Sequence, residues 1–132
     1  MQTIRQRRTK SIFSIPNVYW IGISRYEEGT ELFAIKADDE YVGLIGGGYD
    51  EDGVTGYINP FMIDQRYQKN GYAKSALRLM IEYLRNSLHV DKININHSKA
   101  NTSVSNLYES LGFFVYNETD DEYQRKMDLA NK

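Results

Sequence analysis

Gln68-Lys69-Asn70-Gly71-Tyr72-Ala73-Lys74-Ser75 joins two segments with different hydrophobic patterns. The run before it, Tyr57 to Ile63, is apolar and extended in character, and the run after it, Tyr72 to Leu88, carries apolar residues at helical spacing. Because these are the patterns of a strand and of an amphipathic helix, the segment is predicted to be a strand-turn-helix junction with Gly71 near the helix start.

This junction has the features of an anion-binding site. The first turn of a helix carries backbone N–H groups without intrahelical partners and the positive end of the helix dipole. A glycine there lets a phosphate group approach the main chain, because no Cβ stands in the way. Lys69 and Lys74 add positive charge beside it.

Two kinds of phosphate loop agree with parts of the segment. A Walker-type loop, GxxxxGK[ST], needs glycines where the chain has Gln68 and Ala73, so only Lys74-Ser75 agrees with it, and we reject that interpretation. The pattern that fits throughout is Q-x-x-G-x-A, after a strand that ends Phe61-Met62-Ile63-Asp64.

A second motif follows downstream. Asn101 precedes Leu107-Tyr108-Glu109-Ser110-Leu111-Gly112-Phe113, which reads N-x(5)-L-Y-x-x-x-G-F. Together the two motifs resemble the GNAT family of N-acetyltransferases, whose pyrophosphate loop is commonly [QR]-x-x-G-x-[GA]. Two motifs in the right order are far harder to obtain by chance than one. Through the stretch Phe61 to Gln68 and the acidic turn before it, the chain resembles the bacterial spermine/spermidine-type members, over roughly residues 38–113.

The resemblance implies one domain over residues 1–132, of the α+β class, with a mixed and mostly antiparallel central sheet and packed helices. It implies acetyl-CoA as co-substrate. The main chain around Met62 and Ile63 is expected to bind the pantetheine arm, an electrostatic role that needs no special side chain. The remaining residues expected at the cofactor are Gln68, Lys69, Asn70, Gly71, Tyr72, Ala73, Lys74 and Asn101.

Tyr108 is the expected catalytic acid, because the family's tyrosine in this motif protonates the leaving thiolate. A phenol with an ordinary pKa of about 10 stays protonated at neutral pH and can donate to a thiolate, whose ordinary pKa is about 8.5. The alternative is a core aromatic on an apolar helix face. Asn101 likewise has two compatible interpretations, a cofactor contact and a plain helix cap.

No general base is assigned. The position that matches the glutamate of some family members is Tyr57, with Asn59 on the same side, and neither is a carboxylate. A water relay to Asp50, Glu51 or the Tyr57 hydroxyl, or simple desolvation of the amine, remains open.

The rest of the chain predicts a meander followed by alternating strands and helices. Polar turns are expected at 37–40, 50–53 and 118–122. Gly46 to Gly48 suggest either a bulge or a surface that something flat approaches closely, and Pro60 predicts a strand that is bulged or unpaired there. Met1 to Ser11 is polar and basic, and Ile12 to Ile23 predicts no regular element. The expected elements are strands at 31–36, 41–48, 55–63, 92–97, 113–116 and 123–129, and helices at 72–88 and 102–111.

Composition narrows the class of protein. The 132 residues suit one small domain, and a net charge of -2 argues against a dedicated nucleic-acid binder. Cysteine is absent, which excludes disulfides and thiolate metal sites, and the two histidines form no ligand-spaced cluster, so no metal is expected. No apolar run approaches the roughly 20 residues of a membrane span. We expect a cytoplasmic protein.

The acceptor is predicted to be a small primary amine, with a polyamine favoured by the acidic turns, although each turn alone is more simply a solvated loop. The family normally begins with a strand and one or two helices that wall the acceptor side, and only the first thirty or so residues are available for them. This favours a homodimer, or alternatively a domain that binds acetyl-CoA or CoA as a sensor without turnover. A bare structural domain is the weakest alternative.

Overall fold

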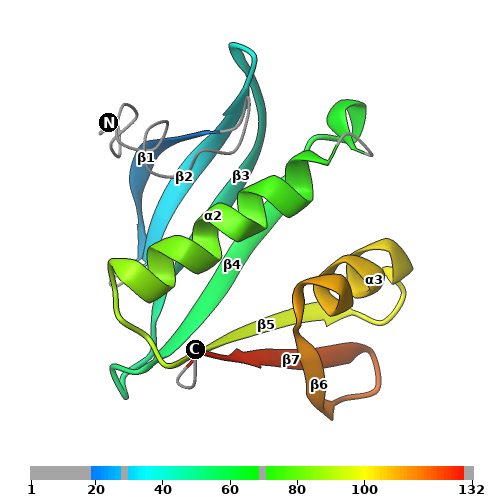
Figure 1. The fold of residues 1–132 in the computed structure, drawn as a ribbon. Helices are drawn as coiled ribbons and strands as arrows, with labels where there is room; N and C mark the ends of the chain where they lie inside the picture. Colours follow the sequence, from blue (N-terminus) through cyan, green and yellow to red (C-terminus); the bar gives the residue numbers. More distant parts are fainter. Residues whose placement is uncertain (1–18, 28–29, 69–70, 130–132) are drawn as a thin grey trace.

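In the part of the chain that the structure describes, one sheet with two helices against it makes up the fold (Figure 1). The computed structural model describes residues 19–27, 30–68 and 71–129. In this part of the chain the strand order is β1-β2-β3-β4-β5-β7-β6, and all neighbours are antiparallel except the parallel pair β4 and β5. The elements are β1 (Tyr19–Glu27), β2 (Thr30–Ala37), β3 (Glu40–Tyr49), β4 (Thr55–Ile63), the 3₁₀ turn η1 (Gln65–Tyr67), α2 (Tyr72–Asn86), β5 (Lys92–Ser98), α3 (Thr102–Leu111), β6 (Phe114–Glu118) and β7 (Glu122–Asp128).

The predicted class, α+β with a mixed and mostly antiparallel sheet, is confirmed. Most strand bounds differ from the predicted ones by one or two residues, and two differences are larger. The irregular stretch that ends at Ile23 did not predict β1, whose strand begins at Tyr19. Helix α2 ends at Asn86 rather than Leu88. His89 takes a positive φ of 57°, which is not a right-handed helical conformation, so the chain turns away from the helix axis there. The prediction for Met1 to Ser11 lies outside the described residues.

Helix α2 supplies one side of the core. Figure 1 shows it lying across β2, β3 and β4, with α3 beside β5 and β7. Its predicted apolar face is buried at Ala76, Leu77, Met80, Ile81 and Leu84, and Leu79 is buried as well. Burial of each leucine contributes about 1.5–3 kcal/mol. The sheet residues of the same core cluster include Phe33, Ile35, Ile45, Ile58, Ile93 and Ile95.

The β2–β3 hairpin has the predicted turn. Asp38 and Asp39 both take positive φ, 50° and 72°. This left-handed pair is the turn geometry that matches the twist of two antiparallel strands. The hairpin tip is therefore fixed by two residues, and it carries Glu40 at the start of β3.

A bulge interrupts β4 where Pro60 predicted one. Ile45 pairs with Phe61 and Gly47 pairs with Ile58, so Gly46 stands opposite both Asn59 and Pro60. A Cβ on Gly46 would come within 2.9 Å of Pro60 Cδ. Glycine at this position therefore lets the bulged part of β4 lie close against β3.

Strands β4 and β5 form a fork. They pair only at Thr55–Lys92, Gly56–Ile93 and Tyr57–Asn94, and beyond that point they diverge (Figure 1). We call the divergence the β4–β5 fork and Tyr57 with Asn94 its vertex. Beyond Tyr57, β4 remains paired with β3 but has no ladder partner on the fork side among the described residues. The bulge bends β4 away and explains the divergence.

Candidate functional site

The fork exposes backbone groups of β4. Asp64 N–H donates to the Val42 carbonyl at 2.7 Å, and the register pairs Met62 with Leu44. Because hydrogen-bonded and non-hydrogen-bonded pairs alternate in an antiparallel ladder, the N–H and C=O of Met62 point to β3, and those of Phe61 and Ile63 point into the fork. Of the two predicted residues, only Ile63 turns main-chain groups into the fork, and Phe61, which was not predicted, does so as well. Contact of this main chain with a cofactor stays a prediction.

The start of α2 is an uncapped helix terminus. Gly71 is its N-cap, with φ 80° and no side-chain cap, and nothing lies within 4 Å of the place where a Cβ would stand. The first intrahelical bond runs from Ser75 N–H to the Gly71 carbonyl at 3.1 Å. The N–H groups of Tyr72, Ala73 and Lys74 are thus left for an external acceptor. This geometry fits a pyrophosphate.

Gln68 links this loop to the fork. Its Nε2 donates to the Ile63 carbonyl at 3.0 Å, which holds the loop against the end of β4. The Ile63 N–H keeps its direction into the fork. Lys69 and Asn70, which were also predicted at the cofactor, lie outside the described residues.

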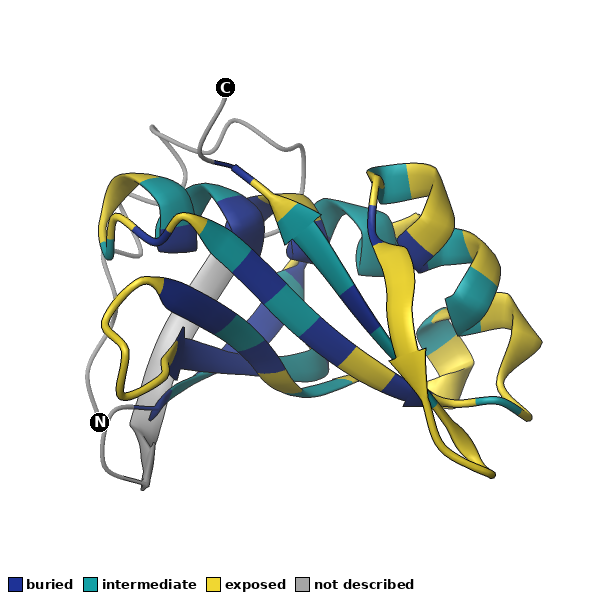
Figure 2. Cartoon of the chain, turned by 90° about the horizontal axis from the view of Figure 1, so that it is seen from below, coloured by how far each residue is buried: buried dark blue, intermediate teal, exposed yellow. Residues whose placement is uncertain are grey.

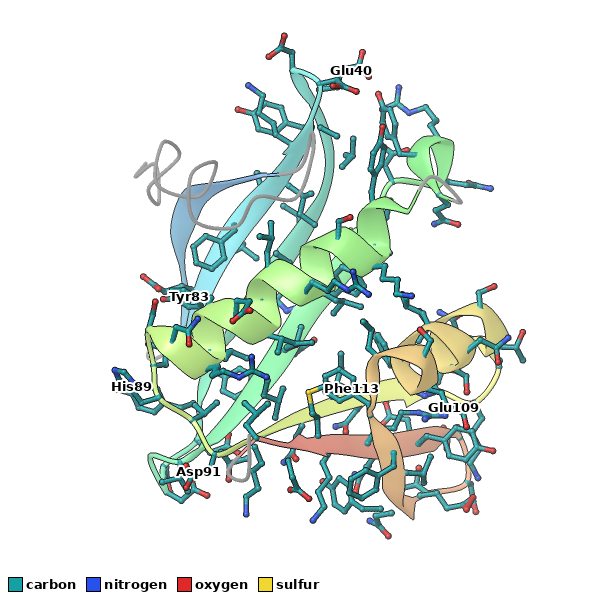
Figure 3. The ribbon with its side chains drawn as sticks, viewed as in Figure 1. Glu40, Tyr83, His89, Asp91, Glu109 and Phe113 are labelled. Atoms are coloured by element: carbon teal, nitrogen blue, oxygen red, sulfur yellow. The ribbon has the colours of Figure 1, made fainter. Side chains whose placement is uncertain are left out.

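The η1 turn is anchored on both sides. Asp64 accepts from Arg66 N–H at 2.9 Å and pairs with the Arg66 side chain at 3.1 Å, and this hydrogen bonding lowers the pKa of Asp64. Tyr67 donates its hydroxyl proton to Glu40 at 2.5 Å, a bond that raises the pKa of Tyr67. Glu40 lies at the hairpin tip (Figure 3). Sequence periodicity carries no signal for such long-range contacts.

Asn101 is the N-cap of α3, which confirms the helix-cap interpretation. Its side-chain oxygen accepts from Val104 N–H at 3.1 Å. Gly112 ends the helix with φ 104°, as predicted. The additional cofactor contact of Asn101 remains a prediction, and the cap bond is compatible with it because the side-chain amide keeps two donors.

Tyr108 lies on the inner face of α3 in the core cluster, with 4% of its surface exposed. Its ring contacts the His97 ring edge-on at 5.4 Å between centroids and the Phe113 ring at 6.0 Å. The Tyr108 hydroxyl has no hydrogen-bond partner among the described residues. Its oxygen is not fully buried and keeps some access to solvent, because the one fully buried, unpartnered side-chain polar atom in the described residues is Arg85 Nε. Tyr108 is thus packed as a core aromatic and still presents a free phenol.

Burial raises the pKa of Tyr108 to about 12, which predicts a pH dependence of stability. Below pH 10 both the folded and unfolded states keep the proton, and this contribution to stability is complete. As pH rises from 10 through 12 the unfolded state, with a pKa of about 10, loses its proton first and stability falls. Between pH 9 and 11 the free energy of unfolding should drop by about 1.4 kcal/mol more in the wild type than in Tyr108→Phe, measured by urea denaturation. An equal drop in both proteins would refute the assigned burial effect.

Tyr57, the residue that matches the family's base position, is held at the vertex of the fork. Its hydroxyl is hydrogen-bonded to the hydroxyl of Thr30 on β2. Thr30 and Tyr57 both pair with Gly48, and this glycine lets the two side chains meet across β3. Sequence reasoning missed Thr30, because its contact with Tyr57 depends on the register of three strands and no local pattern marks it.

The acidic turns are engaged in local structure. Asp52 accepts from the Thr55 hydroxyl at 2.6 Å and from the N–H groups of Val54 and Thr55, and these bonds lower its pKa. Glu118 pairs with Lys99 at 2.7 Å. The solvated-loop interpretation is therefore supported for these two residues. No described carboxylate is hydrogen-bonded to Tyr57.

Two other kinds of feature are absent from the described residues. No group of three or more His, Asp or Glu side chains comes together in a way that could hold a metal ion. No helix in this part of the chain has the length and apolar character needed to cross a bilayer.

Solved structures share this fold. A GNAT family acetyltransferase from Elizabethkingia anophelis with acetyl-CoA bound superposes with a TM-score of 0.72 at 18% identity, over 86% of this chain and 99% of that one. The N-acetyltransferase PseH of Campylobacter jejuni in complex with acetyl coenzyme A gives 0.68 at 19% identity, over 77% of this chain and 70% of that one.

Sequence comparison adds a relative and a family. The spermine/spermidine N(1)-acetyltransferase of Bacillus subtilis is 32% identical over 74 residues, 54% of this chain and 49% of that protein. The chain thus spans about half the length of the curated relatives it matches. The model of the acetyltransferase (GNAT) family matches residues 4–113. A match over most of the chain, together with the fork and the uncapped loop, establishes that this chain belongs to the GNAT family of acetyltransferases.

Proposed function

We propose that the chain is an acetyl-CoA-dependent N-acetyltransferase that acts on a primary amine. The observation that carries the proposal is the pairing of two features: a fork in the sheet with the main chain of Phe61 and Ile63 turned into it, and an uncapped helix start at Gly71 joined to the end of the same strand. One suits a pantetheine arm and the other a pyrophosphate. Acetyl-CoA contains both groups in that order.

The reaction is a direct transfer. The amine nitrogen attacks the thioester carbonyl, a C–N bond forms, and the C–S bond breaks with its electron pair on sulfur. Backbone N–H groups in the fork would stabilise the carbonyl oxygen as it becomes negative. The Tyr108 hydroxyl supplies a proton to the sulfur and regains one from solvent, and the amine loses a proton to solvent, so the enzyme returns to its starting state.

For the acceptor we propose a polyamine or another small cationic amine. The support is the likeness to the Bacillus subtilis protein named a spermine/spermidine N(1)-acetyltransferase and the overall acidic balance of the chain, with a net charge of -2. Unpaired carboxylates of the exposed turns would raise the local concentration of a cation.

The test is release of free thiol from acetyl-CoA in the presence of spermidine, compared with an aminoglycoside and with an amino acid amide. We expect release that requires both the protein and the amine, with the highest kcat/KM for spermidine. Release with another amine alone would reject the polyamine acceptor and keep the enzyme. Binding of acetyl-CoA without release for any amine would favour the sensor hypothesis.

A homodimer and a cytoplasmic location remain predictions. For the dimer, the sheet ends in β6, which is exposed along its whole length (Figure 2). The large side chains of Phe114 and Tyr116 in this strand are exposed. Edge strands with apolar side chains can pair with a second chain. Light scattering of the purified protein would give its mass in solution.

A further inference from the structure

A buried arginine ties α3 to the sheet. Arg125 of β7 is only 6% exposed, and its guanidinium donates three hydrogen bonds, each 2.9 Å long. Nε donates to His97 Nε2 on β5, one terminal nitrogen donates to the Phe113 carbonyl after α3, and the other donates to the Ser105 hydroxyl in α3. One side chain thus contacts β5, the first half of α3 and a residue just after its end.

The charge of this arginine has no anionic partner. No described carboxylate forms an ion pair with Arg125. Arginine cannot lose its proton in a protein, so His97 Nε2 must accept the hydrogen bond from Arg125. The His97 ring then carries its proton on Nδ1, which donates to the Ser98 carbonyl at 3.0 Å. A buried charge held only by neutral acceptors and by the Tyr123 ring, 5.9 Å away, is costly and needs a compensating role.

The three acceptors surround Tyr108. Ser105 lies one turn before it on α3, and Phe113 N–H donates to the Tyr108 carbonyl at 3.0 Å. Among the described residues, the rings of His97 and Phe113 contact the Tyr108 ring. Figure 3 shows Phe113 at the inner side of α3, where helix and sheet meet. The residues that fix the Tyr108 ring are therefore the residues that Arg125 holds.

We propose that Arg125 is a positioning residue for the reaction: it sets the place of the Tyr108 hydroxyl through His97, Ser105 and Phe113, without touching substrate. This inference rests on the proposed function for its kinetic consequence. Only a planar group with donors in three directions can satisfy all three acceptors at once, and an ammonium of similar length cannot reproduce that arrangement. A misplaced proton donor costs rate even when substrate binding is intact.

A double-mutant cycle tests the proposal. Arg125→Lys should lower kcat about 10- to 100-fold in the wild-type background and leave the Kd for acetyl-CoA within about twofold. In the Tyr108→Phe background the same change should lower kcat by less than about twofold, because there is no hydroxyl left to position. An equal loss in both backgrounds, or no loss in either, would overturn the proposal. Exposed Arg78 supplies the matched control, Arg78→Lys, with wild-type kcat.

A milder variant covers the case in which Arg125→Lys does not fold. Ser105→Ala removes one of the three acceptors and leaves the guanidinium in place. Its loss of kcat, about two- to fivefold, should also vanish in the Tyr108→Phe background. If the loss persists there, Ser105 acts independently of Tyr108 and the proposed network is wrong.

A second readout separates this inference from the proposed function. Tyr108 ring signals are assigned in tyrosine-labelled NMR spectra by their absence from Tyr108→Phe. They should be displaced from ordinary tyrosine positions by the rings of His97 and Phe113. In Arg125→Lys, or Ser105→Ala if that variant replaces it, they should shift or broaden, and in Arg78→Lys they should not. If no amine supports turnover, the proposed function fails, and unchanged Tyr108 signals would then overturn the positioning role as well.

Discussion

Tyr108→Phe is expected to lower kcat for amine acetylation by about 100- to 1,000-fold, while the Kd for acetyl-CoA changes by less than about twofold. Loss of a positioned general acid typically costs about 10²- to 10⁴-fold. The ring packing against His97 and Phe113 is retained, since phenylalanine keeps the same ring. The hydroxyl has no hydrogen-bond partner among the described residues, so its removal leaves no buried group unpaired. Thiol release and calorimetry measure the two quantities.

The control is Tyr49→Phe, the same change at an exposed tyrosine at the end of β3. It should leave kcat unchanged. If Tyr108→Phe also keeps kcat within about threefold of the wild type, Tyr108 is a core aromatic with no part in proton transfer.

Gly71→Glu is expected to weaken acetyl-CoA binding by more than about 100-fold. The new side chain would project into the open space at the start of α2, where a pyrophosphate is proposed to bind, and would bring a negative charge to it. It would also force a residue with a Cβ to adopt φ 80°, at a cost of roughly 1–2 kcal/mol. Calorimetric titration gives the affinity, and urea denaturation gives the stability.

Gly53→Glu is the matched control. Gly53 has φ 75° and also has nothing within 4 Å of its Cβ position, but it lies in the turn before β4. Both variants should lose similar stability, and only Gly71→Glu should lose affinity. Equal acetyl-CoA affinity in the two variants would show that the loop binds nothing.

Local signals predicted the helices and turns correctly because they are encoded within a few residues. The apolar spacing from Ala76 to Leu84 gives the buried face of α2, and Asn101 and Gly112 cap α3 as their residue types predict. The bulge at Pro60 follows from its missing N–H. The fork itself could be expected only through the family resemblance.

Contacts between distant strands could not be read in this way. The Arg125 network joins residues up to 28 positions apart, and the Tyr57–Thr30 bond spans 27. One signal was present. Tyr123, Arg125 and Met127 stand at every second position of β7 and therefore share one face of the strand. Arg125 pairs with the buried Ile95, so a charged residue lies on the inward face. Such a residue usually has a specific partner or a function.

The most direct test is calorimetric titration of the protein with acetyl-CoA, followed by spermidine in the same sample. We predict micromolar binding of acetyl-CoA and, on addition of the amine, heat accompanied by stoichiometric release of free thiol. No detectable binding of acetyl-CoA would contradict the central claim, because the fork and the uncapped helix at Gly71 would then hold no cofactor.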